Sequence, residues 1–187
     1  MSIVNIEDII SDLSSVPTDI IMAELRKLEV DISDSKFHHV FSAYGLSNFI
    51  SGAPLHVLRG NTETPDDEMN GIRWNGVFII RGYVAMVLMR SNHLERGLDA
   101  IHEESPLIPF KKHLRAGKRG EETITQHIRN AFSHGSYEFE SNMQIITFQD
   151  RDWRASIKTS QFLDGLCEQV FRFYMAAYES KLSLRNH

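Results

Sequence analysis

The chain has little of several features that would otherwise reveal its class. It contains a single cysteine, Cys167, which excludes an intramolecular disulfide and any zinc site built from several cysteines, and this favours a reducing compartment. Its net charge of −5 excludes an overall positive field that would attract nucleic acid or a membrane, so any such affinity must come from a local patch. At 187 residues it is nevertheless long enough to bury the core of one domain.

Motifs for nucleotides, metals and membranes are missing as well. The sequence has neither G-x4-G-K-[ST] nor G-x-G-x-x-G, and neither H-E-x-x-H nor H-x3-H, so we expect no cofactor and no metal. The most apolar run, residues 76–89, is too short to cross a bilayer and contains Arg81. The first residues lack the basic start of a secretion signal. These absences favour a soluble, cytoplasmic chain without a membrane partner.

Apolar side chains at helical spacing predict a mostly helical fold. The expected helices cover residues 6–14, 18–29, 35–50, 67–103, 121–134 and 160–178, with a short helix after Pro106 and Pro109 and a loop at 51–66. After Gly135 the apolar period changes to two, which predicts one short β-hairpin with strands at 137–139 and 143–148. The expected fold class is all-α (mostly), a helical bundle in which residues 1–60 are a helical addition to a domain at 65–180.

One helix end carries an unusual group of polar side chains. Residues 126–135, QHIRNAFSHG, end in a glycine, and Arg129, Asn130 and His134 stand in the last turns before it. Cations in a last turn suit the helix dipole, and glycine is common directly after a helix. Stabilisation of the helix end is therefore a sufficient explanation for the arginine and the histidine, but it does not explain the asparagine between them.

The spacing directs the three side chains differently. Asn130 and His134 are four residues apart and share one helix face, so the amide can orient the imidazole. Arg129 lies about 140° around the helix from His134. One helix cannot readily aim both side chains at a single atom, whereas two copies of the helix that cross in a dimer can share one cleft.

The pattern R-N-x3-H, formed by Arg129, Asn130 and His134, resembles the R-polar-x3-H motif of HEPN domains. The order of the expected elements adds to this resemblance over residues 65–180, since a long central helix, a short helix, the motif helix ending in His-Gly and an apolar helix follow one another. HEPN domains are all-helical bundles, and many are metal-independent ribonucleases that act in toxin–antitoxin pairs or in defence against phages and plasmids. The resemblance therefore implies RNA as substrate, a homodimer with a composite site and, in some settings, an inhibitory protein partner.

The chemistry of these residue types fits cleavage of RNA. The 2′-OH of RNA is a built-in nucleophile, so the enzyme needs only to move protons and to stabilise charge on the phosphate. His134 suits the acid/base role and Arg129 the phosphate oxygens, with Asn130 as the group that orients the histidine. The expected products are a 2′,3′-cyclic phosphate and a 5′-OH, and DNA is spared because it lacks the 2′-OH.

Basic side chains gather just before the motif helix. They are Lys111, Lys112, Arg115, Lys118 and Arg119, which make up five of the 20 lysines and arginines in the chain. Such a run is usually solvated surface, but next to the motif it is also the place where we expect the RNA backbone to bind.

Two further features resemble parts of HEPN motifs but are better explained as ordinary structure. Arg96 and His102 form a looser R-x5-H pair, but Gly97 stands where a polar residue belongs, so we take the pair as unrelated. One branch of HEPN toxins carries a tyrosine two residues after the histidine, which a partner nucleotidyltransferase modifies. Here Tyr137 follows His134 by three residues, which favours a strand residue over a modification site.

The sequence therefore predicts a homodimeric HEPN endoribonuclease. A non-catalytic HEPN module that binds RNA, a nucleotide or a protein is the first alternative. The second is a structural helical dimer in which the motif only closes a helix.

Overall fold

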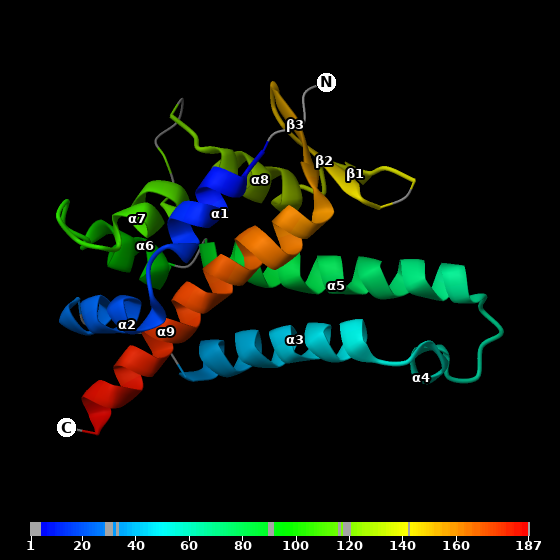
Figure 1. Ribbon diagram of the computed structural model, residues 1–187, viewed down its shortest axis with the longest axis horizontal. Helices are drawn as coiled ribbons and strands as arrows, with labels where there is room; N and C mark the ends of the chain where they lie inside the picture. The colour runs from blue at the N-terminus through cyan, green and yellow to red at the C-terminus, as the bar shows by residue number, and fades with distance from the viewer. Residues whose placement is uncertain are drawn as a thin grey trace.

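The computed structural model of the chain describes residues 5–28, 32, 34–89, 92–115, 117, 121–141 and 143–186. Over these residues the protein is mostly helical with a small antiparallel sheet, as Figure 1 shows, and this confirms the mostly-α class. In chain order the elements are α1 (Glu7–Ser14), α2 (Thr18–Lys27), α3 (Asp34–Gly52), α4 (Leu55–Arg59), α5 (Asp66–Met89), α6 (Asn92–Asp99), α7 (Ile108–Leu114), α8 (Ile124–Ser133), β1 (Tyr137–Phe139), β2 (Ile145–Asp150), β3 (Trp153–Lys158), the π-helix η1 (Gln161–Cys167) and α9 (Glu168–Arg185).

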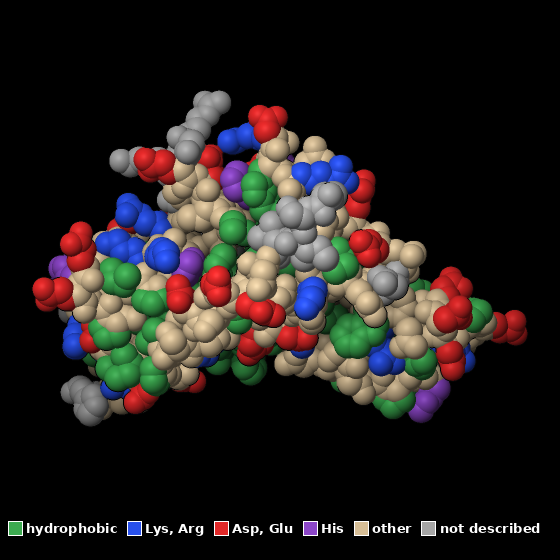
Figure 2. Space-filling view, turned by 45° about the horizontal axis from the view of Figure 1, so that its top comes forward, with side chains coloured by type: hydrophobic (Ala, Val, Ile, Leu, Met, Phe, Trp, Pro, Cys, Tyr) green, Lys and Arg blue, Asp and Glu red, His purple; other side chains and the backbone are tan. Residues whose placement is uncertain are grey.

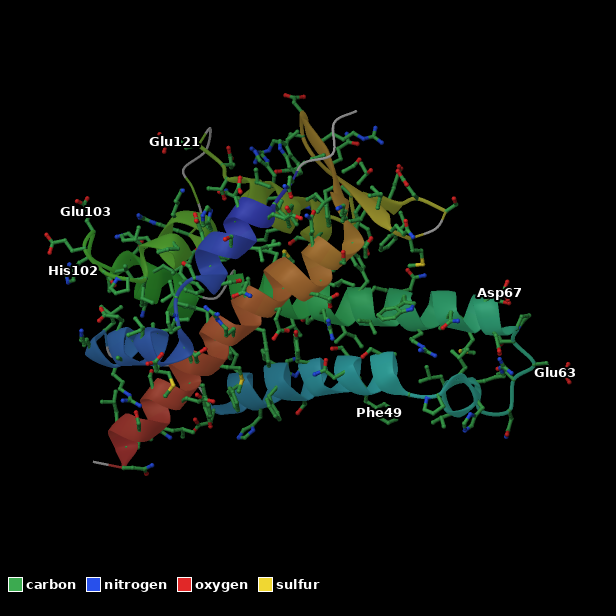
Figure 3. The ribbon with its side chains drawn as sticks, viewed as in Figure 1. Phe49, Glu63, Asp67, His102, Glu103 and Glu121 are labelled. Carbon is green, nitrogen blue, oxygen red and sulfur yellow. The ribbon has the colours of Figure 1, made fainter. Side chains whose placement is uncertain are left out.

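The long helices α3, α5 and α9 determine the arrangement of the other elements. α9 runs diagonally through the molecule with α2 packed along it, while α3 and α5 lie antiparallel in an arm that ends at α4 (Figure 1). The end of the arm is acidic, with Glu63 and Asp67 projecting outward (Figure 3). The sheet and α8 pack on α5 on the side away from α3.

An aromatic cluster fixes α8 in place. Phe78 of α5 contacts Phe132 of α8, Phe139 of β1 and Phe162 of η1, with ring centroids 5.6, 4.7 and 5.2 Å apart. Full burial of one such side chain stabilises the fold by about 1.5–3 kcal/mol. Gly82, one turn beyond Phe78, makes room for the Phe132 ring, because a Cβ at this position would overlap it. The motif helix is therefore held against α5 by its apolar side.

The sheet has one buried and one open face. Ile146 and Phe148 of β2 are buried against the core, and Ile157 and Ala155 of β3 stand opposite them. Because side chains alternate along a strand, the residues between them point to the other face. The expected hairpin is therefore one part of a three-stranded sheet in the order β1-β2-β3.

Three helical regions differ from the expectation in detail. The helix expected at 67–103 corresponds to α5 and α6 and ends at Asp99, and residues 90 and 91 lie outside the described residues. The loop expected at 51–66 contains the short helix α4. The closing helix begins with the π-helix η1 and continues to Arg185. Among the described helices, none combines the length and the apolar composition that crossing a membrane requires.

Candidate functional site

Helix α8 carries the R-N-x3-H motif and is capped at both ends. The hydroxyl of Thr123 accepts a hydrogen bond from the backbone N–H of Gln126 at 3.3 Å. At the other end Gly135 has a φ of +67°, which glycine adopts without a steric cost, and the N–H of Ser136 donates to the Ala131 carbonyl at 2.8 Å. The predicted helix end is confirmed, and the chain enters β1 directly after the motif.

His134 lies on the surface at this end of α8. It is the C-cap residue and is exposed. Within the part of the chain that the structure describes, its imidazole forms no hydrogen bond to another residue. Both ring nitrogens are therefore accessible to a ligand that approaches the end of the helix.

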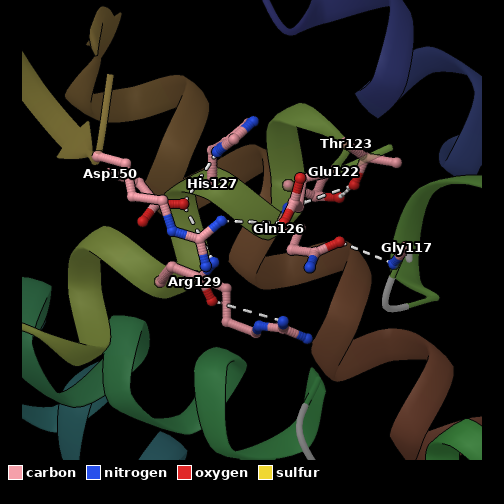
Figure 4. A network of polar contacts seen from close by, with 10 residues as sticks. Gly117, Glu122, Thr123, Gln126, His127, Arg129 and Asp150 are labelled. Carbon is pink, nitrogen blue, oxygen red and sulfur yellow. Dashed lines mark hydrogen bonds and ion pairs between the residues drawn. The ribbon is translucent and has the colours of Figure 1, made fainter. Parts of the chain in front are cut away.

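Asn130 is engaged with the sheet. Its Nδ2 donates to Oδ2 of Asp150 at 3.1 Å, and its Oδ1 accepts from Nη2 of Arg129 at 3.5 Å, a weak contact (Figure 4). In place of the expected contact with His134, the amide thus links the arginine of the motif to the end of β2. The same Oδ2 of Asp150 lies 2.9 Å from Nδ1 of His127, whose ring stacks on Trp153 with planes 10° apart.

Asp150 is a buried carboxylate at the centre of this network. Its side chain is only 7% exposed, and burial by itself would raise the pKa of the carboxyl. Hydrogen bonds from His127 and Asn130, with attraction from His127 and Arg151, act in the opposite direction and hold the pKa below its ordinary value. Asp150 is therefore ionised at neutral pH, and its charge favours the tautomer of His127 in which Nδ1 carries the proton.

Arg129 is buried, with 7% of the residue exposed. Its place on the helix is about 140° around from that of His134. One of its two terminal nitrogens, Nη2, lies 3.5 Å from Oδ1 of Asn130. In a single copy of the chain, a phosphate in solvent therefore meets little of this guanidinium.

The basic run lies at the other end of α8 from His134. Lys111 donates to the Ile101 carbonyl, and Arg115 lies 2.9 Å from Asp99. Lys112 is 3.8 Å from Asp12, while Lys118 and Arg119 are outside the described residues. The surface in Figure 2 shows basic side chains interspersed with acidic ones over the face that is in view.

A hollow of about 390 Å³ opens on the polar face of the sheet, next to the end of α8. Gly135 and Ser136 form one side of it, directly after His134, and Thr147 and Gln149 of β2 line it as well. The lining is completed by Tyr137, Glu138 and two arginines. Arg151 pairs with Glu122 at 3.2 Å and Arg154 with Glu138 at 3.7 Å, and both guanidinium side chains are more than half exposed.

The network contains two ionisable residues that the motif does not include, His127 and Asp150. His127 precedes His134 by seven residues and so shares its helix face, which is a signal present in the sequence. Asp150 carries no such signal, because its position depends on how β2 pairs and packs against α8. The Arg96–His102 pair plays no part here: His102 projects at the far edge of the molecule, beyond α6 (Figure 3).

Comparison with protein-family models, with curated proteins and with solved structures finds no match for the chain. Among the described residues, no three His, Cys, Asp or Glu side chains are grouped so that they could hold a metal ion. The site is therefore defined by its own geometry: an exposed histidine, a partly buried Arg–Asn–Asp–His network on the same helix, and a polar hollow beside it.

Proposed function

We propose that the protein is a metal-independent endoribonuclease of the HEPN type that acts as a homodimer. The observation that carries this proposal is the exposed imidazole of His134, at a glycine-closed helix end beside a hollow of nucleotide size. The R-N-x3-H motif supplies the family, and a toxin or an effector in conflict with phages or plasmids is the setting that the family suggests.

The proposed reaction needs only proton transfer and charge stabilisation. The 2′-oxygen of one nucleotide loses its proton to a base and attacks the adjacent phosphorus, the bond from phosphorus to the 5′-oxygen breaks, and the leaving oxygen takes a proton from an acid. His134 fills one of these roles and His134 of a second copy fills the other, which yields the 2′,3′-cyclic phosphate and the 5′-OH. General acid and base catalysis of this kind contributes about 10²–10⁴-fold.

Arg129 and Asn130 complete the proposed site. We assign phosphate stabilisation to Arg129 in the dimer, where a second α8 can bring the scissile phosphate to its guanidinium. In the single chain, its contact with Asn130 and the bond from Asn130 to Asp150 fix the orientation of α8 against the sheet. Asn130 therefore positions the motif through the sheet.

An apolar stripe supports the second copy. Ile72, Ile79 and Tyr83 recur at helical spacing along one side of α5 and are each more than half exposed. Gly76 lies between them on the same side, with no atom within 4 Å of the Cβ that an alanine would add. Because α8 packs on α5 at Gly82, a partner on this stripe would also lie close to the motif helix.

The experiment is to incubate the purified protein with mixed cellular RNA in EDTA, beside the variant His134→Ala, and to map the new 3′ ends. Cyclic-phosphate ends that disappear with the variant are the expected result. His102→Ala is the matched control, because that histidine is equally exposed but remote from α8. RNA that stays intact at high protein concentration would overturn the proposal.

A non-catalytic RNA-binding module is the second candidate, and the burial of Arg129 favours it. In that case RNA binds with the same affinity to the wild type and to His134→Ala, and no new ends form. Expression in cells separates the two functions further, because relief of toxicity by Arg129→Ala and by His134→Ala alike is expected only of the enzyme.

A further inference from the structure

We infer that the hollow on the open face of the sheet is a binding site for one nucleotide of single-stranded RNA, with Arg151 and Arg154 as the groups that hold its phosphates. The inference rests on the proposed function, since it names the substrate contact of the same site. It assigns to the sheet a role that neither the motif nor the basic run at 111–119 provides.

The position of the hollow is the first argument. Its wall includes Gly135, the residue that follows His134, and Ser136, the last residue before β1. A molecule in the hollow is therefore adjacent to the proposed acid/base. The volume of about 390 Å³ is within the range of sites for small ligands and admits one nucleotide rather than a duplex.

The chemistry of the lining is the second argument. A guanidinium has five N–H donors in a planar fork that matches the oxygens of a phosphate, and one carboxylate occupies at most two of them. Arg154 is 52% exposed and pairs with Glu138, itself 81% exposed, across 3.7 Å. Such a solvated pair contributes little, so a phosphate can replace the carboxylate at small cost.

Arg151 is held in a different manner. Its partner Glu122 is 8% exposed and lies at 3.2 Å, which anchors the guanidinium from one side while 61% of the arginine side chain remains exposed. Arg151 follows Asp150 directly in the chain, so the turn that presents it is tied to α8 through the Asp150 contacts with His127 and Asn130. The two arginines thus stand on an ordered frame that includes the motif helix.

Besides Glu138 of the loose ion pair, the wall carries two uncharged polar side chains. Gln149 is exposed and offers an amide with both donors and an acceptor, and Thr147 offers a hydroxyl that is shared with Ser156 at 2.8 Å. These groups suit the edge of a nucleobase. RNA is read mostly in single strands, whose unpaired bases present that edge, so the site fits an unpaired nucleotide.

The other candidate cations near the motif are buried or already paired, which is the third argument for Arg151 and Arg154. The guanidinium of Arg129 is buried, whereas the charge of an RNA strand requires cationic groups in contact with solvent. The described members of the basic run lie at the far end of α8 and are engaged by Asp12, Asp99 and a backbone carbonyl. Arg151 and Arg154 are exposed and line the hollow whose wall contains Gly135, the residue after His134.

Binding of a fluorescent oligonucleotide of about ten 2′-O-methyl nucleotides tests this inference, because such a strand cannot be cleaved through its 2′ position. Fluorescence anisotropy would be measured from 50 to 200 mM salt for the wild type and the double variant Arg151→Ala/Arg154→Ala. We expect the double variant to bind about tenfold more weakly or worse, with the slope of log K against log salt reduced by about 1.4, or 0.7 for each lost phosphate contact.

Arg185→Ala is the matched control. Arg185 is 56% exposed and, like the two arginines of the hollow, pairs with one carboxylate, that of Asp34 at 3.2 Å, but it lies at the end of α9. We expect the affinity of Arg185→Ala for the oligonucleotide to stay within twofold of that of the wild type. Arg154→Ala alone provides a second reading should the double variant unfold, since Arg154 is an exposed strand residue with one loose ion pair.

Unchanged affinity and salt slope in a folded double variant would overturn the inference. The test is independent of the proposed catalysis, because the strand is not cut. Arginine-dependent binding by a protein that leaves cellular RNA intact would support the nucleotide site and reject the ribonuclease. Cleavage that continues in the double variant with unchanged KM would support the ribonuclease and reject the nucleotide site.

Discussion

Asp150 joins three parts of the site through one carboxylate, and its replacement tests the network at the scale of a single residue. Asp150→Asn removes the charge that two donors share, His127 and Asn130. Loss of a buried, hydrogen-bonded charge of this kind is expected to reduce the free energy of unfolding by about 1–3 kcal/mol at pH 7. Urea denaturation would measure the loss, with the neighbouring exposed Asp152→Asn as the control and an expected change within about 0.5 kcal/mol.

The same carboxylate predicts a dependence on pH with a definite sign. The pKa of Asp150 is lower in the folded protein than its ordinary value of 3.8, so the folded state gains stability from its ionisation at pH values above 3.8. That contribution is lost as the pH falls through the lower, folded pKa. The difference in unfolding free energy between the wild type and Asp150→Asn should therefore shrink below about pH 4, and a difference that stays constant down to pH 2 would show that the carboxylate is not stabilised by folding.

At the scale of an element, the contact between α5 and α8 decides where the motif stands. Gly82→Ala would drive a methyl group into the Phe132 ring, and overpacking of this kind costs about 1–3 kcal/mol. We expect a lower midpoint of thermal unfolding, and reduced RNA cleavage because α8 must shift. Gly71→Ala, in the same helix but with nothing within 4 Å of the new methyl group, should be neutral or stabilising by up to about 1 kcal/mol. Equal midpoints for the two variants would contradict the argument.

The elements that the sequence predicts well are those whose signals are local. Helix α8 is one of them: Ile128 and Phe132 mark its apolar side, and the glycine that ends it has the expected positive φ. β3 is absent from the prediction although its polar residues alternate with apolar ones as in a strand, and its pairing with β2 over six residues establishes it.

The candidate site divides in the same way. The spacing of Arg129, Asn130 and His134 predicts their place at the end of one helix, which is confirmed, but the expected contact of Asn130 with His134 is replaced by one with Asp150. The partner of Asn130 could not be predicted, because Asp150 reaches it through the register of β2 and the packing of the sheet on α8. The hollow is formed only when β2 pairs with both β1 and β3, so no local pattern in the sequence predicts it.

At the scale of the whole molecule, the proposed enzyme requires a second copy of the chain. A single chain leaves Ile72, Ile79 and Tyr83 in water along α5, each 53–54% exposed. A two-fold axis would place this stripe against itself, so that the same residues serve both partners. Gly76 in the middle lets the two helices approach closely, because it adds no side chain between them.

Ile79→Asp tests the dimer at the centre of that stripe. A carboxylate on each of two facing helices would repel and lose hydration, so we expect the variant to be monomeric by analytical ultracentrifugation at micromolar concentration and to lose RNA cleavage at least about tenfold. Its midpoint of unfolding as a monomer should change little, because the position is exposed within one chain. Leu184→Asp, 50% exposed near the end of α9, is the control that should remain dimeric and active. An Ile79→Asp variant that still dimerises would show that α5 is not in the interface. A wild type that is monomeric and active would show the same, and would also mean that one copy of His134 acts without a second.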